Sequence, residues 1–219
     1  LTESKIENRP CCLVLSPPFS LHLSLCFEHK EIQHVREMPY VGSIDQGTTS
    51  TRFILFDHDG AIISSAQQEF KQYLPNEGQC EHDPEEIWHT VEYCVNEALS
   101  STNPKNTLHR TITLEEITCV GITNQRETTV VWDRLTGKSI YPAIVWQDRR
   151  TAEFCSNLSN ISLEDSIQQK TGLLLDPYFS ATKLAWILDN VEGSRKRAEE
   201  GDLLFGTIDT WLIWNLTSK

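Results

Sequence analysis

From Tyr40 onward the chain alternates short β-prone runs with turn residues, a pattern that few folds accommodate. Tyr40–Ile44 and Arg52–Phe56 are two such runs, and Asp45–Thr51 joins them. Asp57–Gly60 has the composition of a turn, and Ala61–Tyr73 continues as a third strand-like run. Short runs of this kind, separated by glycine and polar residues, are typical of antiparallel strands joined by tight turns. The sequence therefore predicts a β-meander at the start of the regular region.

A helix follows the meander, and its first turn is well marked. Asp83 is placed to cap the helix, Pro84 suits the first helical position, and Glu86 has the spacing that completes a capping box. Apolar residues then recur at helical spacing and predict one buried stripe, made of Ile87, Val91, Cys94 or Val95, and Ala98.

The rest of the chain mixes strand-like and helix-like segments. We expect strands at 117–122, 128–132, 143–146 and 203–205, and helices at 149–158, 163–171 (closed by Gly172), 181–190 and 208–214. A strand meander followed by alternating helices and strands predicts an α/β fold, with a mixed β-sheet flanked by helices.

Charge and composition exclude several classes of function. The formal net charge of -12 argues against a nucleic-acid or anionic-membrane surface, because both need clustered Lys and Arg. The chain has no apolar run of about eighteen residues, so we expect no membrane span. Its seven cysteines contain no C-x-x-C pair, and we interpret them as free thiols in a reducing compartment, the cytoplasm. No G-x-x-x-x-G-K-[ST] motif occurs, which excludes a P-loop NTPase.

The loop after the first strand has the chemistry of a phosphate site. Gly47 permits a tight turn, and the hydroxyl residues that follow can turn their side chains and backbone N–H groups toward one anion: Thr48, Thr49, Ser50 and Thr51. Asp45 could hold Mg²⁺ directly or through water, and Arg52 adds a cation. An ordinary hairpin with Ser/Thr-rich turn chemistry explains the loop equally well.

A second group of residues has the chemistry of a polyol site. Arg126 offers a planar fork of donors and Glu127 a carboxylate acceptor, which together match adjacent hydroxyl groups. Trp146 could cover the carbon side of a small polyol, and Tyr178 adds a phenolic hydroxyl. Alternatively, Arg126 and Glu127 neutralise one another while the two aromatic residues only pack.

Several blocks of sequence, in this order, resemble the FGGY family of carbohydrate kinases and its glycerol kinase branch. They are DQGTTSTR at Asp45–Arg52, EHDPEEIW at Glu81–Trp88, GITNQRETTVVWD at Gly121–Asp133, AIVWQDRRTAE at Ala143–Glu153, TGLLLDPYFSATKLAWILDNVEGSR at Thr171–Arg195 and LLFGTIDTWLIWNLT at Leu203–Thr217. The resemblance implies a ribonuclease H-like domain of the actin, hexokinase and Hsp70 ATPase type. It also implies phosphorylation of glycerol to sn-glycerol 3-phosphate with ATP and Mg²⁺.

The resemblance also implies residue roles. Nucleotide phosphates would meet Thr48, Thr49, Ser50 and Arg52, and Asp45 would lie on the metal and phosphate side. Glycerol would be held by Arg126, Glu127, Trp146 and Tyr178. The family's general base, an aspartate in a later D-Q pair, is expected beyond Lys219, so no catalytic residue is assigned within the chain.

The resemblance begins at residue 40. We expect residues 1–39 to be a disordered or mispredicted extension, and residues 40–219 to be the substrate-binding N-terminal domain of the kinase, without its nucleotide domain. On this interpretation the chain is an inactive fragment of a cytoplasmic enzyme that forms homo-oligomers. Two alternatives remain open: a kinase for a larger sugar such as xylulose or ribulose, or a catalytically dead module that binds a polyol or a partner.

Overall fold

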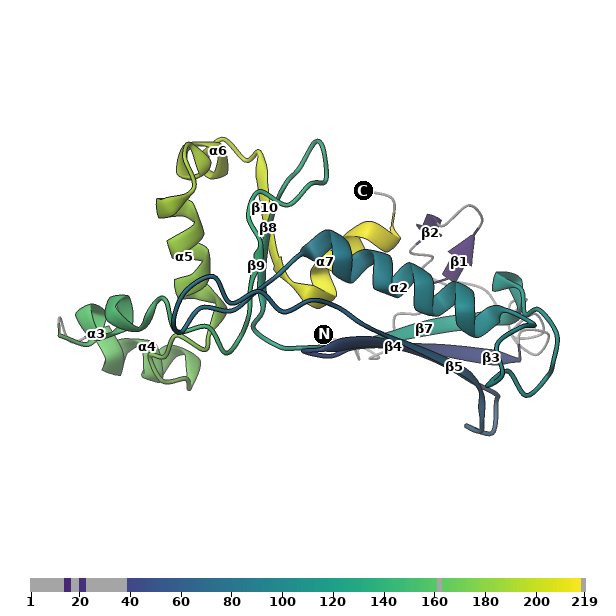
Figure 1. The fold of residues 1–219 in the computed structure, drawn as a ribbon. Helices are drawn as coiled ribbons and strands as arrows, with labels where there is room; N and C mark the ends of the chain where they lie inside the picture. The colour runs from purple at the N-terminus through teal and green to yellow at the C-terminus, as the bar shows by residue number, and fades with distance from the viewer. Residues whose placement is uncertain (1–13, 17–19, 23–38, 161–162, 218–219) are drawn as a thin grey trace, which may run out of the picture.

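A computed structural model describes residues 14–16, 20–22, 39–160 and 163–217 of the chain (Figure 1). Most of the extension expected at 1–39 lies outside these residues, apart from two short strands, β1 (Val14–Ser16) and β2 (Ser20–His22), which pair antiparallel.

The predicted meander forms three antiparallel strands of a mixed sheet. These are β3 (Tyr40–Gln46), β4 (Ser50–Phe56) and β5 (Ile62–Glu69). A fourth strand, β7 (Ile117–Asn124), lies parallel to β3 at the edge of the sheet, in the order β5-β4-β3-β7. The mixed sheet expected from the sequence is confirmed, and the carboxyl ends of β3 and β7 lie side by side.

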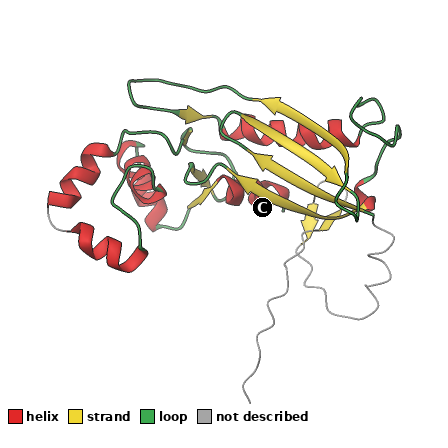
Figure 2. Ribbon diagram, turned by 90° about the horizontal axis from the view of Figure 1, so that it is seen from below, coloured by secondary structure: helices red, strands yellow, loops and turns green. Residues whose placement is uncertain are grey.

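Helix α2 (Pro84–Leu99) runs across one face of this sheet (Figures 1 and 2). All five residues of the predicted stripe are buried, and they pack with alternate residues of the strands in a single apolar core. The Asp83 carboxylate caps the helix by accepting the Glu85 N–H at 2.9 Å. Glu86, expected to complete a capping box, instead accepts the Lys71 N–H at 3.1 Å, because the loop before β6 passes close to the first helical turn.

A second sheet, in the order β10-β8-β9-β6, is antiparallel throughout. Its strands are short: β6 (Glu81–His82), β8 (Thr129–Asp133), β9 (Ala143–Ile144) and β10 (Leu203–Thr207). Helix α7 (Ile208–Leu216) follows β10 directly and brings Trp211 against Trp132, with ring centroids 5.4 Å apart. The Trp211 indole N–H donates to the carbonyl of Pro84 at 2.9 Å, which ties α7 to the first turn of α2.

The remaining helices lie beside the second sheet, at the left of Figure 1. They are α3 (Ala152–Asn160), α4 (Leu163–Thr171), α5 (Ser180–Asn190) and α6 (Ser194–Glu199), and a 3-10 turn, η1 (Leu114–Glu116), precedes β7. Neither α6 nor η1 was predicted. Helix α3 begins later than expected, because the Arg149 N–H bonds to the carbonyl of Gly78 and Arg150 bonds to Asp148.

Within the described residues, each helix is too short or too polar to cross a lipid bilayer.

Candidate functional site

The hydroxyl-rich loop between β3 and β4 is a tight turn at the carboxyl end of β3. The Gly47 N–H donates to the carbonyl of Ser50 at 2.9 Å, which closes the turn. Thr49 is exposed at its tip. The Thr48 hydroxyl accepts the indole N–H of Trp146 at 3.0 Å, across 98 positions of sequence. One residue expected on the phosphate side is thus bonded directly to one expected on the polyol side.

Trp146 is held from several directions. Its backbone N–H donates to the Thr128 hydroxyl at 3.2 Å, while its indole N–H is bonded to Thr48. The Tyr178 ring meets it edge-on, with centroids 6.0 Å apart and planes at 65°. The Tyr178 ring also meets the Phe179 ring edge-on, with centroids 5.1 Å apart. The side chains of Trp146 and Tyr178 are half-buried, so each keeps surface available to a ligand.

Glu127 ends the turn after β7 and anchors a distant helix. Its Oε2 accepts both the backbone N–H of Ser180 at 2.9 Å and the Ser180 hydroxyl at 2.6 Å. Ser180 is the first residue of α5, and Phe179 before it provides no side-chain cap, so Glu127 does the capping from another segment. Glu127 also has a φ of 68°, which is uncommon for a residue other than glycine and occurs preferentially at functional sites.

Lys183 fixes the loop that carries Tyr178. Its side chain is buried, and Nζ donates to the carbonyls of Pro177 at 2.6 Å, Phe179 at 3.3 Å and Tyr178. Burial lowers the pKa of the Lys183 ammonium to about 8, while the nearby Glu127 carboxylate opposes that shift. This contribution to the site was not expected from the sequence, because a lysine on a predicted helix is usually exposed.

Arg126 differs from the other three expected polyol residues. Its side chain is exposed and forms no hydrogen bond or ion pair with any residue of the described ranges. Mutual neutralisation of Arg126 and Glu127, the alternative left open above, is therefore not found: the Glu127 carboxylate bonds to Ser180 instead. The Arg126 fork of donors is free to meet a ligand.

Asp45 and Arg52 lie together on the sheet face opposite α2. They are direct partners across β3 and β4, and Thr123 of β7 faces Asp45 on its other side. The Arg52 guanidinium donates to Gln67 at 3.0 and 3.2 Å, and Gln67 donates to the Ser50 hydroxyl at 2.9 Å. The Asp45 carboxylate is half-buried and forms no hydrogen bond to a described residue, so its oxygens are available to a cation.

No group of three or more His, Cys, Asp or Glu residues converges within the part of the chain that the structure describes. Mg²⁺ in kinases is usually held by one or two carboxylates together with substrate phosphates. The single free carboxylate of Asp45, next to the hydroxyl-rich turn, fits that donor set.

A closed circuit of hydrogen bonds lies beneath the loop and was not predicted. It consists of six residues, here called the polar ring: Thr48, Gln72, His82, Gln125, Thr128 and Trp146. The sequence contains one partial indication of the polar ring. Gln46 and Gln125 come just after two strand-like runs, and parallel strands bring such ends together. The contributions of Gln72 and His82 come from loops and strands with no motif that places them.

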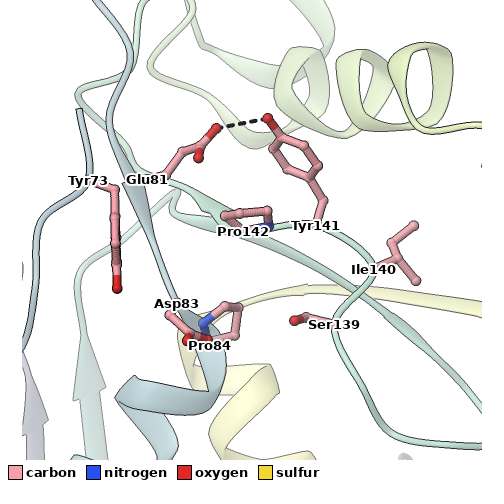
Figure 3. Close-up of a pocket in the computed structure, with 8 residues that line it drawn as sticks. All are labelled: Tyr73, Glu81, Asp83, Pro84, Ser139, Ile140, Tyr141 and Pro142. Carbon is pink, nitrogen blue, oxygen red and sulfur yellow. Dashed lines mark hydrogen bonds between the residues drawn. The ribbon is translucent and has the colours of Figure 1, made fainter. Parts of the chain in front are cut away.

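A pocket of about 380 Å³ lies outside the polar ring, between β6 and the loop before β9 (Figure 3). Glu81 and Tyr141 meet on its wall, where the tyrosine hydroxyl donates to the carboxylate at 2.9 Å. Behind them Arg150, almost fully buried, is paired with both Glu81 and Asp148 at 2.8 Å. These charges satisfy one another, so the pocket wall offers no free cation or anion from this group.

The sequence matches the model of the FGGY family of carbohydrate kinases, N-terminal domain, over residues 40–219. The chain belongs to this family. Residues 1–39 lie outside the match.

Individual relatives agree with this assignment. The chain is 58% identical over 179 residues to a glycerol kinase of Petrotoga mobilis, a match that covers 82% of this chain and 34% of the relative. It is 55% identical over 181 residues to that of Escherichia coli K12, covering 83% and 34%. A crystal structure of Plasmodium falciparum glycerol kinase with ADP superposes with a TM-score of 0.75 at 39% identity, covering 83% of this chain and 35% of that one.

The ribonuclease H-like α/β fold expected from the sequence is thereby confirmed. The chain spans about a third of the length of the curated relatives it matches.

Proposed function

We propose that this chain is the polyol-binding domain of a kinase that transfers phosphate from ATP to glycerol, giving sn-glycerol 3-phosphate. The observation that carries the proposal is the bond from the Trp146 indole N–H to the Thr48 hydroxyl, because it joins the polyol residues to the phosphate loop. The 58% identity to the glycerol kinase of Petrotoga mobilis supports glycerol as the acceptor.

In the proposed site each residue has a definite task. The Arg126 guanidinium and the Glu127 carboxylate bond to glycerol hydroxyls, Trp146 packs against the carbon chain, and Tyr178 adds a phenolic hydroxyl. Both Glu127 and Tyr178 start from held positions, since Ser180 fixes the first and Lys183 fixes the loop of the second. Holding an acceptor in one orientation lowers the barrier to phosphoryl transfer.

On the nucleotide side, Thr48, Thr49 and Ser50 present hydroxyl and backbone N–H groups to the phosphates, and Arg52 adds positive charge. Asp45 would hold Mg²⁺ together with the phosphates, and the bound ion would supply positive charge against the negative charge of the transferring group. We propose that the general base and the adenosine site lie in the part of the relatives' length that this chain does not span. We further propose that the whole enzyme is a cytoplasmic homo-oligomer.

The test is a fusion in which residues 40–219 replace the matching segment of the Escherichia coli K12 glycerol kinase. We expect ATP-dependent phosphorylation of glycerol, with glycerol preferred over xylulose and ribulose. Arg126→Ala should lower kcat/KM for glycerol by about 10- to 100-fold, the effect of losing a charged hydrogen bond. Arg134→Ala, an exposed arginine in the turn after β8, is the matched control and should leave kcat/KM unchanged.

A folded fusion that prefers a ketose would contradict the choice of glycerol. A folded fusion that is inactive on all three substrates would favour the alternative of a catalytically dead module. In that case the chain alone should still bind glycerol in ligand-detected NMR, and Arg126→Ala should abolish the signal.

A further inference from the structure

His82 is a buried member of the polar ring, and the resemblance assigns it no role. It is fully inaccessible to solvent on strand β6. One ring nitrogen, Nε2, lies 2.6 Å from Oε1 of Gln72, and the other, Nδ1, lies 3.2 Å from Nε2 of Gln125. The edge of the Phe70 ring packs against it, with centroids 5.0 Å apart. A buried imidazole with two polar partners is expected to adopt one defined protonation form.

The surrounding amides decide which form that is. Gln46 donates from Nε2 to the carbonyl of Gly47 at 2.8 Å, so its Oε1 must be the acceptor for Nε2 of Gln125 at 3.1 Å. The Oε1 of Gln125 is occupied in the same way, because it accepts the Thr128 hydroxyl at 3.0 Å. The side of Gln125 that faces His82 is therefore an N–H donor. Nδ1 of His82 must accept, and it carries no proton.

The direction of the bond between His82 and Gln72 follows from this assignment. Since Nδ1 is the acceptor, the proton of the neutral ring is on Nε2, which donates to Oε1 of Gln72. Gln72 then directs its Nε2 to the carbonyl of Thr48 at 3.0 Å. The chain of hydrogen bonds thus has a carbonyl acceptor at each end: Gly47 accepts from Gln46, and Thr48 accepts from Gln72. The two carbonyls are neighbours in the hydroxyl-rich loop.

Protonation of His82 would break this arrangement. A charged imidazole donates from both nitrogens, so Nδ1 would face the N–H of Gln125 as a second donor. Turning the Gln125 amide to avoid that conflict would place its oxygen against Oε1 of Gln46 and its nitrogen against the Thr128 hydroxyl. Burial disfavours the charged ring in any case and lowers the pKa of His82 to about 4.

We propose that His82 is a positioning residue: in its neutral, Nε2-protonated form it holds the loop 47–50 at a fixed distance from the turn 125–128. The loop carries the phosphate-side hydroxyls, and the turn carries Arg126 and Glu127, so His82 sets the spacing of the two halves of the site. As a statement about catalysis the inference rests on the proposed function. As a statement about tautomer and geometry it does not.

The first test measures the tautomer in the whole chain labelled with ¹⁵N-histidine. The resonance of His82 is identified among seven histidines by its loss in His82→Phe. We expect one nonprotonated nitrogen at Nδ1 and one protonated nitrogen at Nε2, unchanged from pH 8 to pH 6. A proton on Nδ1, or an averaged signal from two tautomers, would overturn the assignment.

The second test uses kinetics of the fusion described above. His82→Phe keeps the ring and its contact with Phe70 but removes both nitrogens, and it should lower kcat/KM for glycerol by roughly 10- to 100-fold. His82→Gln carries an acceptor and a donor on one amide and can bond to both Gln125 and Gln72, so it should stay within about threefold of wild type.

These variants separate positioning from stability. If His82→Phe lowers the melting temperature but leaves kcat/KM at 25 °C unchanged, His82 is merely structural and the inference is wrong. If His82→Phe fails to fold, His82→Gln decides, since a folded Gln variant with a loss as large as that expected for Phe would also refute it. An inactive fusion with native His82 would count against the proposed function instead, while the tautomer measurement still tests the geometry.

Discussion

Strand β3 passes through two buried regions of opposite chemistry within a few residues. Ile44 lies in the apolar layer between the sheet and α2, where its neighbours are aliphatic and aromatic. Gln46 is on the same face, two residues later, and is equally buried, yet its side chain is bonded to Gly47 and Gln125. The first region is stabilised by area removed from water, and the second by matched donors and acceptors.

The two regions tolerate change differently. An apolar layer depends on volume and shape, so exchanging one aliphatic residue for another costs little. In the polar ring each donor needs one particular acceptor, and a partner left unpaired in a buried position costs about 1–3 kcal/mol. We infer that the layer holds the domain together, whereas the ring fixes the geometry of the site.

The largest effect that separates the regions should be the pH dependence of stability. The pKa of His82 is lowered from its unfolded value of 6.5 to about 4, so between these values the unfolded chain binds a proton that the folded chain does not. The free energy of unfolding should therefore fall by about 3 kcal/mol as the pH drops from 6.5 to 4. Well above pH 6.5 the ring is neutral in both states, so this group causes no pH dependence of stability there.

Carboxylates such as Glu116, whose pKa is lowered by Arg110, also weaken the fold in acid, so the measurement must be a difference. Urea unfolding of the wild type and of His82→Phe across this range isolates the histidine. The wild type should lose stability more steeply than the variant. A difference that stays constant from pH 6.5 to pH 4 would show that His82 titrates alike in both states.

The apolar layer was largely predictable from sequence, and the polar ring was not. Alternation in β3 and β4 and the helical spacing of Ile87, Val91 and Ala98 report burial directly, because each period corresponds to one secondary structure. A glutamine gives no such signal. Gln46 and Gln72 are of a residue type common in exposed loops. The parallel pairing of β3 with β7 brings Gln125 to Gln46. The partners of Gln72 come instead from the loop after β3 and from β6.

The candidate site shows the same contrast. Trp146, Tyr178 and Glu127 were named from residue chemistry and from resemblance. In the structure Trp146 bonds to Thr48, Tyr178 packs on Trp146, and Glu127 bonds to Ser180, two residues after Tyr178. That Glu127 caps α5 was not predictable, because the capped residue is 53 positions away. Contacts of that separation depend on the tertiary fold, which local patterns do not encode.

The next largest effect tests the apolar layer with a matched pair of strand glycines. A Cβ on Gly42 would lie 2.8 and 2.9 Å from atoms of the Phe53 ring, whereas a Cβ on Gly121 would have nothing within 4 Å. Gly42→Ala should therefore lower the free energy of unfolding by about 1–3 kcal/mol. Gly121→Ala should be neutral, or stabilising by up to about 1 kcal/mol, because it reduces the freedom of the unfolded chain.

Urea unfolding at pH 7 measures both glycine variants. Below their unfolding midpoints, both should bind glycerol like the wild type, since the layer does not touch the proposed ligand. Equal destabilisation by the two substitutions would mean that the close approach of Gly42 to Phe53 is not what the layer requires.

The smallest effect concerns the bond that joins the two halves of the site. Trp146→Phe removes the indole N–H that Thr48 accepts, and Thr48→Val removes the hydroxyl that receives it. Each change alone should reduce the free energy of unfolding, and the double variant should lose about 1 kcal/mol less than the sum of the two, because a single hydrogen bond is removed in all three. Urea unfolding of the four proteins gives this coupling energy. Strict additivity would place Thr48 and Trp146 in contact without a bond between them, and this contact would then contribute nothing to holding the loop.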